Sequence, residues 1–223
     1  MKRMLAISDI HGELEKFNRL LKKVNYHSEQ DQLILLGDYV DRGPDSCGVL
    51  NKVMELEEEG AIVLRGNHDD MMVAAAENEP KAWERWVKNG ALETLRSYEP
   101  RMETARLPTS DVFKNHVDFI KKLNYYYETE QYIFVHGGVH PKTPLNETDP
   151  YILVWIRDEF HNGYNGDQTV VFGHTRTARL HGNPDNHQVY FGDNNIVGID
   201  GGAVYGGQLN CYDATNNKTY KVD

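Results

Sequence analysis

The chain has 223 residues, 39% of them hydrophobic and 26% charged, a balance typical of globular proteins with a substantial core and not of disordered or fibrous chains. Its net charge of −10, from 34 acidic and 24 basic residues, argues against a protein that coats nucleic acid or an anionic membrane surface. No apolar run reaches the roughly 20 residues of a membrane-spanning helix, and Cys47 and Cys211 belong to no metal or disulfide motif, so we expect a cytoplasmic protein without nucleic-acid or membrane partners.

Strand and helix patterns alternate over the first seventy residues. Short apolar runs predict buried strands at 4–7, 33–36 and 61–64. Between them, apolar residues recur at helical spacing over 14–24, and a second helix, capped by Asp45 or Ser46, ends before Gly60. This β-α-β-α-β order predicts parallel strands with helices crossing over them.

The rest of the chain divides into a helical segment and a series of strands. Helical patterns dominate from about 69 to 123, where Trp83 and Trp86 are expected to pack in the core. Strands follow at 125–127, 132–135, 169–172, 195–199 and 208–212. Because no linker or repeat separates these parts, we expect a single domain over 1–223 with a mainly helical insertion at about 69–123. Three histidines in polar surroundings are expected to face solvent: His27, His116 and His161.

Polar residues follow the ends of five predicted strands. The five segments are Asp9-Ile10-His11-Gly12, Gly37-Asp38-Tyr39-Val40-Asp41-Arg42-Gly43, Arg65-Gly66-Asn67-His68-Asp69, His136-Gly137-Gly138 and Gly173-His174-Thr175. Since ligands bind outside the carboxyl ends of parallel strands, these loops should converge on one crevice. Singly, each loop could be a helix cap or a turn, but five loops carrying oxygen and imidazole donors together favour a metal site. The absence of sulfur donors favours manganese, iron or zinc.

These motifs resemble those of the calcineurin-like metallophosphoesterases. The segment Gly-Asp-Tyr-Val-Asp-Arg-Gly at 37–43 is similar to the signature of the phosphoprotein phosphatase branch, which includes bacteriophage and bacterial Ser/Thr phosphatases. The likeness continues through Asn89-Gly90, Trp155-Ile156-Arg157 and 199–204, and so spans nearly the whole chain. It implies an α/β fold, a β-sandwich of mixed sheets flanked by helices, with the site at the carboxyl ends of the strands.

The resemblance also implies a role for each motif residue. Two divalent metal ions are expected, manganese first and iron or zinc as alternatives, with Asp38 bridging them. The first ion would be held by Asp9, His11 and Asp38, and the second by Asp38, Asn67, His136 and His174. A hydroxide bridging the ions would attack the phosphoryl group directly. His68 would protonate the leaving group, Asp41 would orient His68, and the phosphate-binding residues would be Arg42 and Arg157.

The resemblance leads to a metal-dependent phosphoesterase, and first of all to a protein Ser/Thr phosphatase. Its substrate would be a phosphorylated protein or a small phosphoester. The alternative is a symmetrical dinucleoside tetraphosphate hydrolase, because Asp69 stands where Ser/Thr phosphatases more typically carry Glu. A non-catalytic scaffold is disfavoured because every ligand, Asp41 and His68 are retained, and a nuclease is disfavoured by the acidic charge.

Overall fold

Two five-stranded sheets form the centre of the protein, in a computed structural model that describes residues 2–223. The first sheet has the order β10-β9-β1-β2-β3 and the second the order β4-β5-β6-β8-β7. The strands of the first sheet are β1 (Arg3–Ile7), β2 (Asp31–Leu35), β3 (Ile62–Val63), β9 (Leu209–Asp213) and β10 (Lys218–Val222). The strands of the second are β4 (Tyr126–Glu128), β5 (Tyr132–Val135), β6 (Thr169–Phe172), β7 (Tyr190–Phe191) and β8 (Ile196–Gly198).

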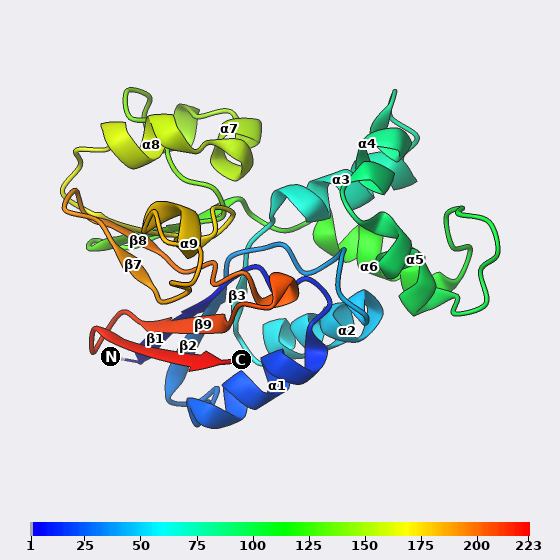
Figure 1. Ribbon diagram of the computed structural model, residues 1–223, viewed down its shortest axis with the longest axis horizontal. Helices are drawn as coiled ribbons and strands as arrows, with labels where there is room; N and C mark the ends of the chain where they lie inside the picture. The colour runs from blue at the N-terminus through cyan, green and yellow to red at the C-terminus, as the bar shows by residue number, and fades with distance from the viewer. Residues whose placement is uncertain (1) are drawn as a thin grey trace.

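Helices cover the outer face of each sheet (Figure 1). Those beside the first sheet are α1 (Leu14–Lys23) and α2 (Ser46–Glu58), and those beside the second are α7 (Pro150–Trp155), α8 (Asp158–Gly163) and α9 (Thr177–Leu180). Two short 3₁₀ helices lie in the second half of the chain, η1 (Leu145–Glu147) and η2 (Ala203–Tyr205). No helix in residues 2–223 is both long enough and apolar enough to cross a membrane.

The alternation of side chains along each strand builds three core layers. In β1, Leu5 and Ile7 pack in the core that also contains residues of α1 and α2, whereas Ala6 points into the core between the two sheets. In β6, Val171 likewise belongs to the core between the sheets, and its neighbours on either side pack under α8. Because successive residues of a strand point to opposite faces, the apolar runs at 4–7 and 169–172 can bury both faces. The predicted β-sandwich of mixed sheets flanked by helices is confirmed.

Parallel pairing brings the loops of the site to one edge. The strands β1, β2 and β3 run parallel to one another, and so do β5, β6 and β8. The chain leaves every one of these strands in the same direction within its sheet. In the first sheet the loops after β2 and β3 touch, since a Cβ atom on Gly37 would clash with the backbone at Gly66. Glycine at 37, with a φ of 102°, therefore allows two motif loops to pack directly together.

The helical segment lies to one side of the sheets (Figure 1). It contains α3 (Asn67–Ala76), α4 (Ala82–Lys88), α5 (Ala91–Tyr98) and α6 (Asp111–Ile120). These helices share one core cluster with α1 and α2. That shared core supports the single domain with a helical insertion at about 69–123, which stays a prediction.

Two of the three histidines expected to face solvent do not. His116 is 2% exposed, because its ring lies between the Tyr98 hydroxyl, at 2.5 Å, and the side-chain oxygen of Asn51, at 3.1 Å. The side chain of His161 is 8% exposed and packs beside Phe160. Polar neighbours in the sequence do not decide exposure, since both rings lie on the inward face of a helix. His27 is exposed, as expected.

Candidate active site

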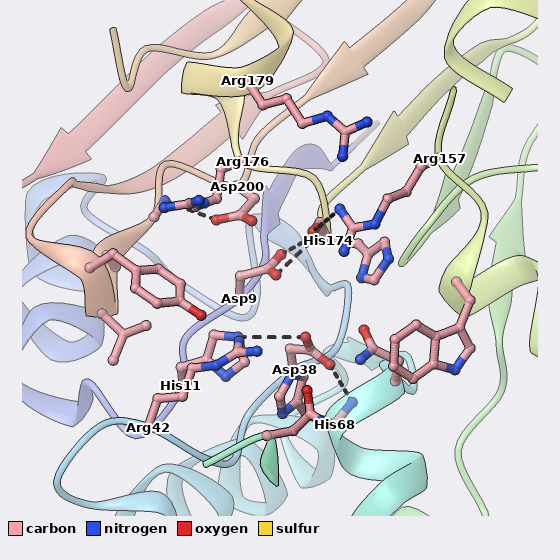
Figure 2. Close-up of a pocket in the computed structure, with 17 residues that line it drawn as sticks. Asp9, His11, Asp38, Arg42, His68, Arg157, His174, Arg176, Arg179 and Asp200 are labelled. Atoms are coloured by element: carbon pink, nitrogen blue, oxygen red, sulfur yellow. Dashed lines mark hydrogen bonds and ion pairs between the residues drawn. The ribbon is translucent and has the colours of Figure 1, made fainter. Parts of the chain in front are cut away.

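The polar residues that follow the strands surround one cleft of about 420 Å³ (Figure 2). The predicted residues among its lining are Asp9, His11, Asp38, Arg42, Asn67, His68, Arg157 and His174. The two remaining predicted residues, Asp41 and His136, lie fully buried behind this lining. All ten predicted site residues are therefore placed in or directly behind one cleft.

Asp38 is the centre of the cluster. Its Oδ2 atom lies 3.5 Å from Nε2 of His11 and 3.3 Å from Nε2 of His136. Asp38 belongs to two groups of side chains whose potential metal-binding atoms lie within 4.8 Å of one another. One group adds His11 and His68, and the other adds His136 and His174. Burial alone would raise the pKa of Asp38, but His136 and His68 hold it well below its usual range. One carboxylate thus faces imidazoles on two sides, as a bridging ligand would.

The hydrogen bonds behind two of these imidazoles determine where their lone pairs point. Nδ1 of His11 lies 2.7 Å from the carbonyl oxygen of Val40, and Nδ1 of His136 lies 3.0 Å from that of Leu36. A carbonyl oxygen can only accept, so each Nδ1 carries a proton, and in the neutral ring that can bind a metal each Nε2 keeps its lone pair. In His136 that lone pair faces the Oδ1 atom of Asn67 at 2.9 Å. Electron pairs directed at oxygens are the arrangement that a bound cation satisfies.

His174 and Asp9 complete the arrangement. Nε2 of His174 is buried and has no hydrogen-bond partner among residues 2–223, which a metal ion would supply. Asp9 stands outside the two groups around Asp38, because its carboxylate accepts the Ser8 hydroxyl at 2.6 Å and the backbone N–H of His174 at 3.0 Å. Oxygen and imidazole donors without sulfur fit a hard or borderline divalent ion.

The motif loops adopt a backbone conformation that side chains rarely tolerate. Six site residues have φ between 45° and 75°: Asp9, His11, Asp38, Asp41, Arg42 and His174. Left-handed conformations in residues other than glycine are energetically costly and concentrate at functional sites. The surrounding contacts must therefore stabilise these loops against the strain.

His68 and Asp41 form a buried pair beside the cluster. Nδ1 of His68 lies 2.6 Å from Oδ2 of Asp41, whose side chain is completely buried. Burial raises the pKa of Asp41, and hydrogen bonds from His68, Thr94 and Trp86 oppose that rise. Because Asp41 engages Nδ1, the other ring nitrogen of His68 is left to face the cleft. The pair has the geometry of a proton donor oriented by a carboxylate.

Four arginines line the cleft, and sequence analysis identified only two of them. Arg42 donates from Nη1 to Nε2 of His11, at 2.7 Å, and Arg157 donates to the carbonyl oxygen of His174 and the hydroxyl of Thr175. The two missed residues are Arg176, which lies over the Tyr205 ring at 4.8 Å, and Arg179, which is paired with Asp158. Figure 2 shows these guanidinium groups around Asp9, Asp38 and His174. A cleft rich in arginine, in a protein with a net charge of −10, indicates an anionic ligand.

Two buried carboxylates support the site without forming part of the Asp38 groups. Asp69 accepts backbone N–H groups from Gly66, Asp38 and Tyr39 at 2.8–3.1 Å. Asp200, which sequence analysis missed, accepts the N–H of Gly202 at 2.8 Å. Burial raises the pKa of Asp69 to about 7 and that of Asp200 to about 8, and nearby carboxylates add to both rises. Asp69 therefore anchors the Asp38 loop and does not reach the cleft.

Known proteins with similar sequences are phosphatases and dinucleoside tetraphosphatases. Serine/threonine-protein phosphatase 1 of Salmonella typhimurium is 27% identical over 92% of this chain and 88% of its own length. The asymmetrical bis(5'-nucleosyl)-tetraphosphatase of Oceanobacillus iheyensis is 26% identical over 92% of this chain and 86% of its own length. The symmetrical enzyme of Nitrosomonas europaea is 25% identical over 82% of this chain, which spans only 58% of that enzyme.

The fold also matches solved structures. A crystal structure of a protein proposed to be a diadenosine tetraphosphatase superposes with a TM-score of 0.75, covering 99% of this chain and 93% of that one at 22% identity. A serine/threonine phosphatase of Saccharomyces cerevisiae superposes with a TM-score of 0.61 at 15% identity, covering 94% and 71%. The sequence model of the calcineurin-like phosphoesterases matches residues 2–210. The chain therefore belongs to the calcineurin-like phosphoesterase family and is a hydrolase of that family.

Proposed function

We propose that this protein hydrolyses phosphomonoesters with two divalent metal ions held at the cluster around Asp38. Manganese is the expected metal, with iron or zinc as alternatives. The observation that carries this proposal is that Asp38 faces imidazoles on both sides, while the same cleft is lined by three arginines that have no carboxylate partner in residues 2–223: Arg42, Arg157 and Arg176. As the family resemblance implies, Asp9, His11 and Asp38 would hold one ion, and Asp38, Asn67, His136 and His174 the other. Two such ions would lower the pKa of a shared water towards neutrality and so supply the attacking nucleophile.

The remaining side chains act on the substrate. Arg42 and Arg157 bind the non-bridging phosphate oxygens, since neither is paired with a carboxylate in residues 2–223. For Arg42 this requires that its guanidinium leave His11 and turn to the phosphate. His68 donates a proton to the departing oxygen, and Asp41 keeps its ring in the required orientation.

Phosphoserine and phosphothreonine in proteins are the proposed substrates. The support is the sequence likeness to the Salmonella phosphatase, which extends over nearly all of both chains. The cleft is open to solvent on the side of Tyr205, a residue that is 54% exposed. A phosphorylated side chain on a protein surface can enter a cleft of that kind.

A second candidate is hydrolysis of dinucleoside polyphosphates. One feature of the site favours it, the position of Arg176, which has no carboxylate partner in residues 2–223 and shares the Tyr205 ring with Arg42. The stem of Arg176 runs across Gly202, where no side chain blocks it. An additional guanidinium beside the phosphate-binding pair would suit a chain of several phosphates.

Side-by-side turnover tests both candidates. With added Mn²⁺, we expect release of phosphate from p-nitrophenyl phosphate and from phosphoserine and phosphothreonine peptides. Turnover of diadenosine tetraphosphate alone, with monoesters at background, would replace the first candidate by the second. In that case Arg176→Ala should lower tetraphosphate hydrolysis more than Arg179→Ala, because Asp158 already neutralises Arg179. No turnover of any phosphate ester with Mn²⁺, Fe²⁺ or Zn²⁺ would refute the proposed function.

A further inference from the structure

Two helices of the helical segment, α4 and α5, contact the buried side of the His68–Asp41 pair. We propose that Trp86 of α4 and Thr94 of α5 are positioning residues, which hold the Asp41 carboxylate and, through it, the His68 ring in line for proton donation. This inference rests on the proposed function, since it concerns the proton given to the leaving group.

Three side chains donate hydrogen bonds to the Asp41 carboxylate, and two of them come from α4 and α5. Nε1 of Trp86 lies 2.9 Å from Oδ1 and 3.0 Å from Oδ2, and the Thr94 hydroxyl lies 2.8 Å from Oδ1. The third partner is Nδ1 of His68, at 2.6 Å from Oδ2. Trp86, Thr94 and Asp41 are all completely buried, so water cannot replace a lost donor. The carboxylate plane, and with it the direction of the bond to His68, depends on Trp86 and Thr94.

The Thr94 hydroxyl also holds the backbone of Asp41. A carboxylate can only accept, so the single hydroxyl proton of Thr94 goes to Oδ1 of Asp41. The same oxygen then accepts the backbone N–H of Asp41, at 2.8 Å, and lies 3.0 Å from the hydroxyl of Ser46. Asp41 has a φ of 75°, a conformation that needs such support. Thr94 therefore holds both the backbone N–H and the carboxylate of Asp41, the residue that orients His68.

The turn between α4 and α5 holds the next residue as well. The backbone N–H of Arg42 donates to the carbonyl oxygen of Gly90 at 3.1 Å. A Cβ atom at position 90 would come within 2.7 Å of the Arg42 side chain, and Gly90 has a φ of 105°. We name residues 82–98, which comprise α4, this turn and α5, the supporting hairpin. It contacts both the residue that orients the proton donor and a residue of the proposed phosphate clamp.

Conservative variants separate positioning from bulk packing. Trp86→Phe and Thr94→Val keep most of the buried volume but remove the N–H and O–H donors to Asp41. The matched control is Trp83→Phe, because Trp83 lies on the same helix, packs edge-on against Trp86, and its indole N–H makes no hydrogen bond within residues 2–223. His68→Asn serves as the reference for complete loss of the proton donor.

The kinetic experiment compares two leaving groups under saturating Mn²⁺. For O-phosphoserine, whose alkoxide needs a proton, we expect kcat to fall about 10- to 100-fold in Trp86→Phe and Thr94→Val, a usual loss when an orienting partner is removed. For p-nitrophenyl phosphate, whose phenolate leaves without a proton, we expect a loss at least about fivefold smaller. KM should change little for either ester, and Trp83→Phe should match the wild type.

Proton NMR of the metal-free protein tests the same positioning role, even where a variant is too weakly active for kinetics. The His68 Nδ1 proton, bound to Asp41 at 2.6 Å, should give a far-downfield proton resonance in the wild type that is absent in His68→Asn. We expect this resonance to move or broaden in Trp86→Phe and Thr94→Val, and to stay in place in Trp83→Phe.

The outcomes distinguish the inference from the proposed function. If His68→Asn shows the leaving-group dependence but Trp86→Phe and Thr94→Val lose activity equally for both esters, or not at all, the positioning role is wrong and the proposed function stands. A resonance that stays in place in both variants would likewise overturn the positioning role. If His68→Asn itself shows no leaving-group dependence, both the proton-donor role and the inference fail.

Discussion

Asp69 offers a sharp test of how the site is held together, because the sequence left its meaning open. It stands where Ser/Thr phosphatases more typically carry Glu, which suggested a role in substrate choice. In the structure it is completely buried in the first turn of α3, and its Oδ2 atom accepts the N–H groups of Asp38 and Gly66 while Oδ1 accepts that of Tyr39. We predict that Asp69→Asn destabilises the protein without changing substrate preference.

The expected magnitude follows from these three hydrogen bonds. Asparagine has one side-chain oxygen, which can keep the two bonds of Oδ2, but its amide nitrogen would then face the N–H of Tyr39. One buried donor left without a partner costs about 1–3 kcal/mol. Burial raises the pKa of Asp69 to about 7, so removing the charge offsets part of this cost. We expect a net loss of about 2 kcal/mol, which lowers the Tm by about 4–8 °C in a protein of this size.

Thermal unfolding in EDTA measures this loss without the contribution of bound metal. The matched control is Asp70→Asn, because Asp70 is adjacent, 25% exposed and paired with Arg65, and the expected change is at most about 1 kcal/mol. Turnover of a phosphopeptide and of diadenosine tetraphosphate should fall by the same factor in Asp69→Asn. A changed ratio of the two activities at unchanged Tm would show that Asp69 selects the substrate and would refute the anchoring role.

Two further predictions concern the phosphate clamp and the pH dependence of stability. Arg42→Ala should lower kcat/KM about 10- to 100-fold for every phosphate ester, as loss of a charged hydrogen-bond donor would, and Arg42→Lys should recover only part of it; a loss confined to one ester in steady-state kinetics would contradict the clamp. Burial raises the pKa of Asp31, but the two hydrogen bonds from Arg3, at 2.8 Å each, and one from the His27 backbone hold it below its usual value. Because the pKa of Asp31 is lower in the folded protein than in the unfolded chain, its ionised carboxylate stabilises the fold above the unfolded pKa of about 4. Asp31→Asn should therefore lower the urea midpoint at pH 7. The difference from wild type should shrink as the pH falls below about 4. A difference that stays constant down to pH 2 would argue against this linkage.

The sequence predicted the features that depend on local pattern. Apolar runs and helical spacing located the β-α-β-α-β half, and parallel pairing of β1, β2 and β3 then fixes where the following loops must lie. The convergence of those loops could be predicted because polar residues directly follow each apolar run. The strands β7 and β10 could not be predicted in this way: the first, Tyr190–Phe191, buries neither residue, and the second, Lys218–Val222, buries only Val222.

The remaining site residues could not be read from pattern because their roles depend on tertiary contacts. Trp86 has the helical spacing of a core residue and is one, but which acceptor its N–H meets is decided by how α4 packs against the Asp41 loop. Arg176 follows the Gly173-His174 motif without belonging to it, and its place in the cleft, over the Tyr205 ring, depends on tertiary contacts. His116 was wrongly expected to face solvent for the same reason.

Metal titration of the chelator-treated protein tests the central claim most directly. Mn²⁺ bound per chain and p-nitrophenyl phosphate turnover are measured together for the wild type and for Asp38→Asn, which removes the carboxylate facing both imidazole pairs. The account predicts no turnover in EDTA, two ions at saturation with activity rising as they bind, and weakened binding of both ions with near-complete loss of activity in Asp38→Asn. Full turnover in EDTA, or wild-type metal binding and activity in Asp38→Asn, would contradict it.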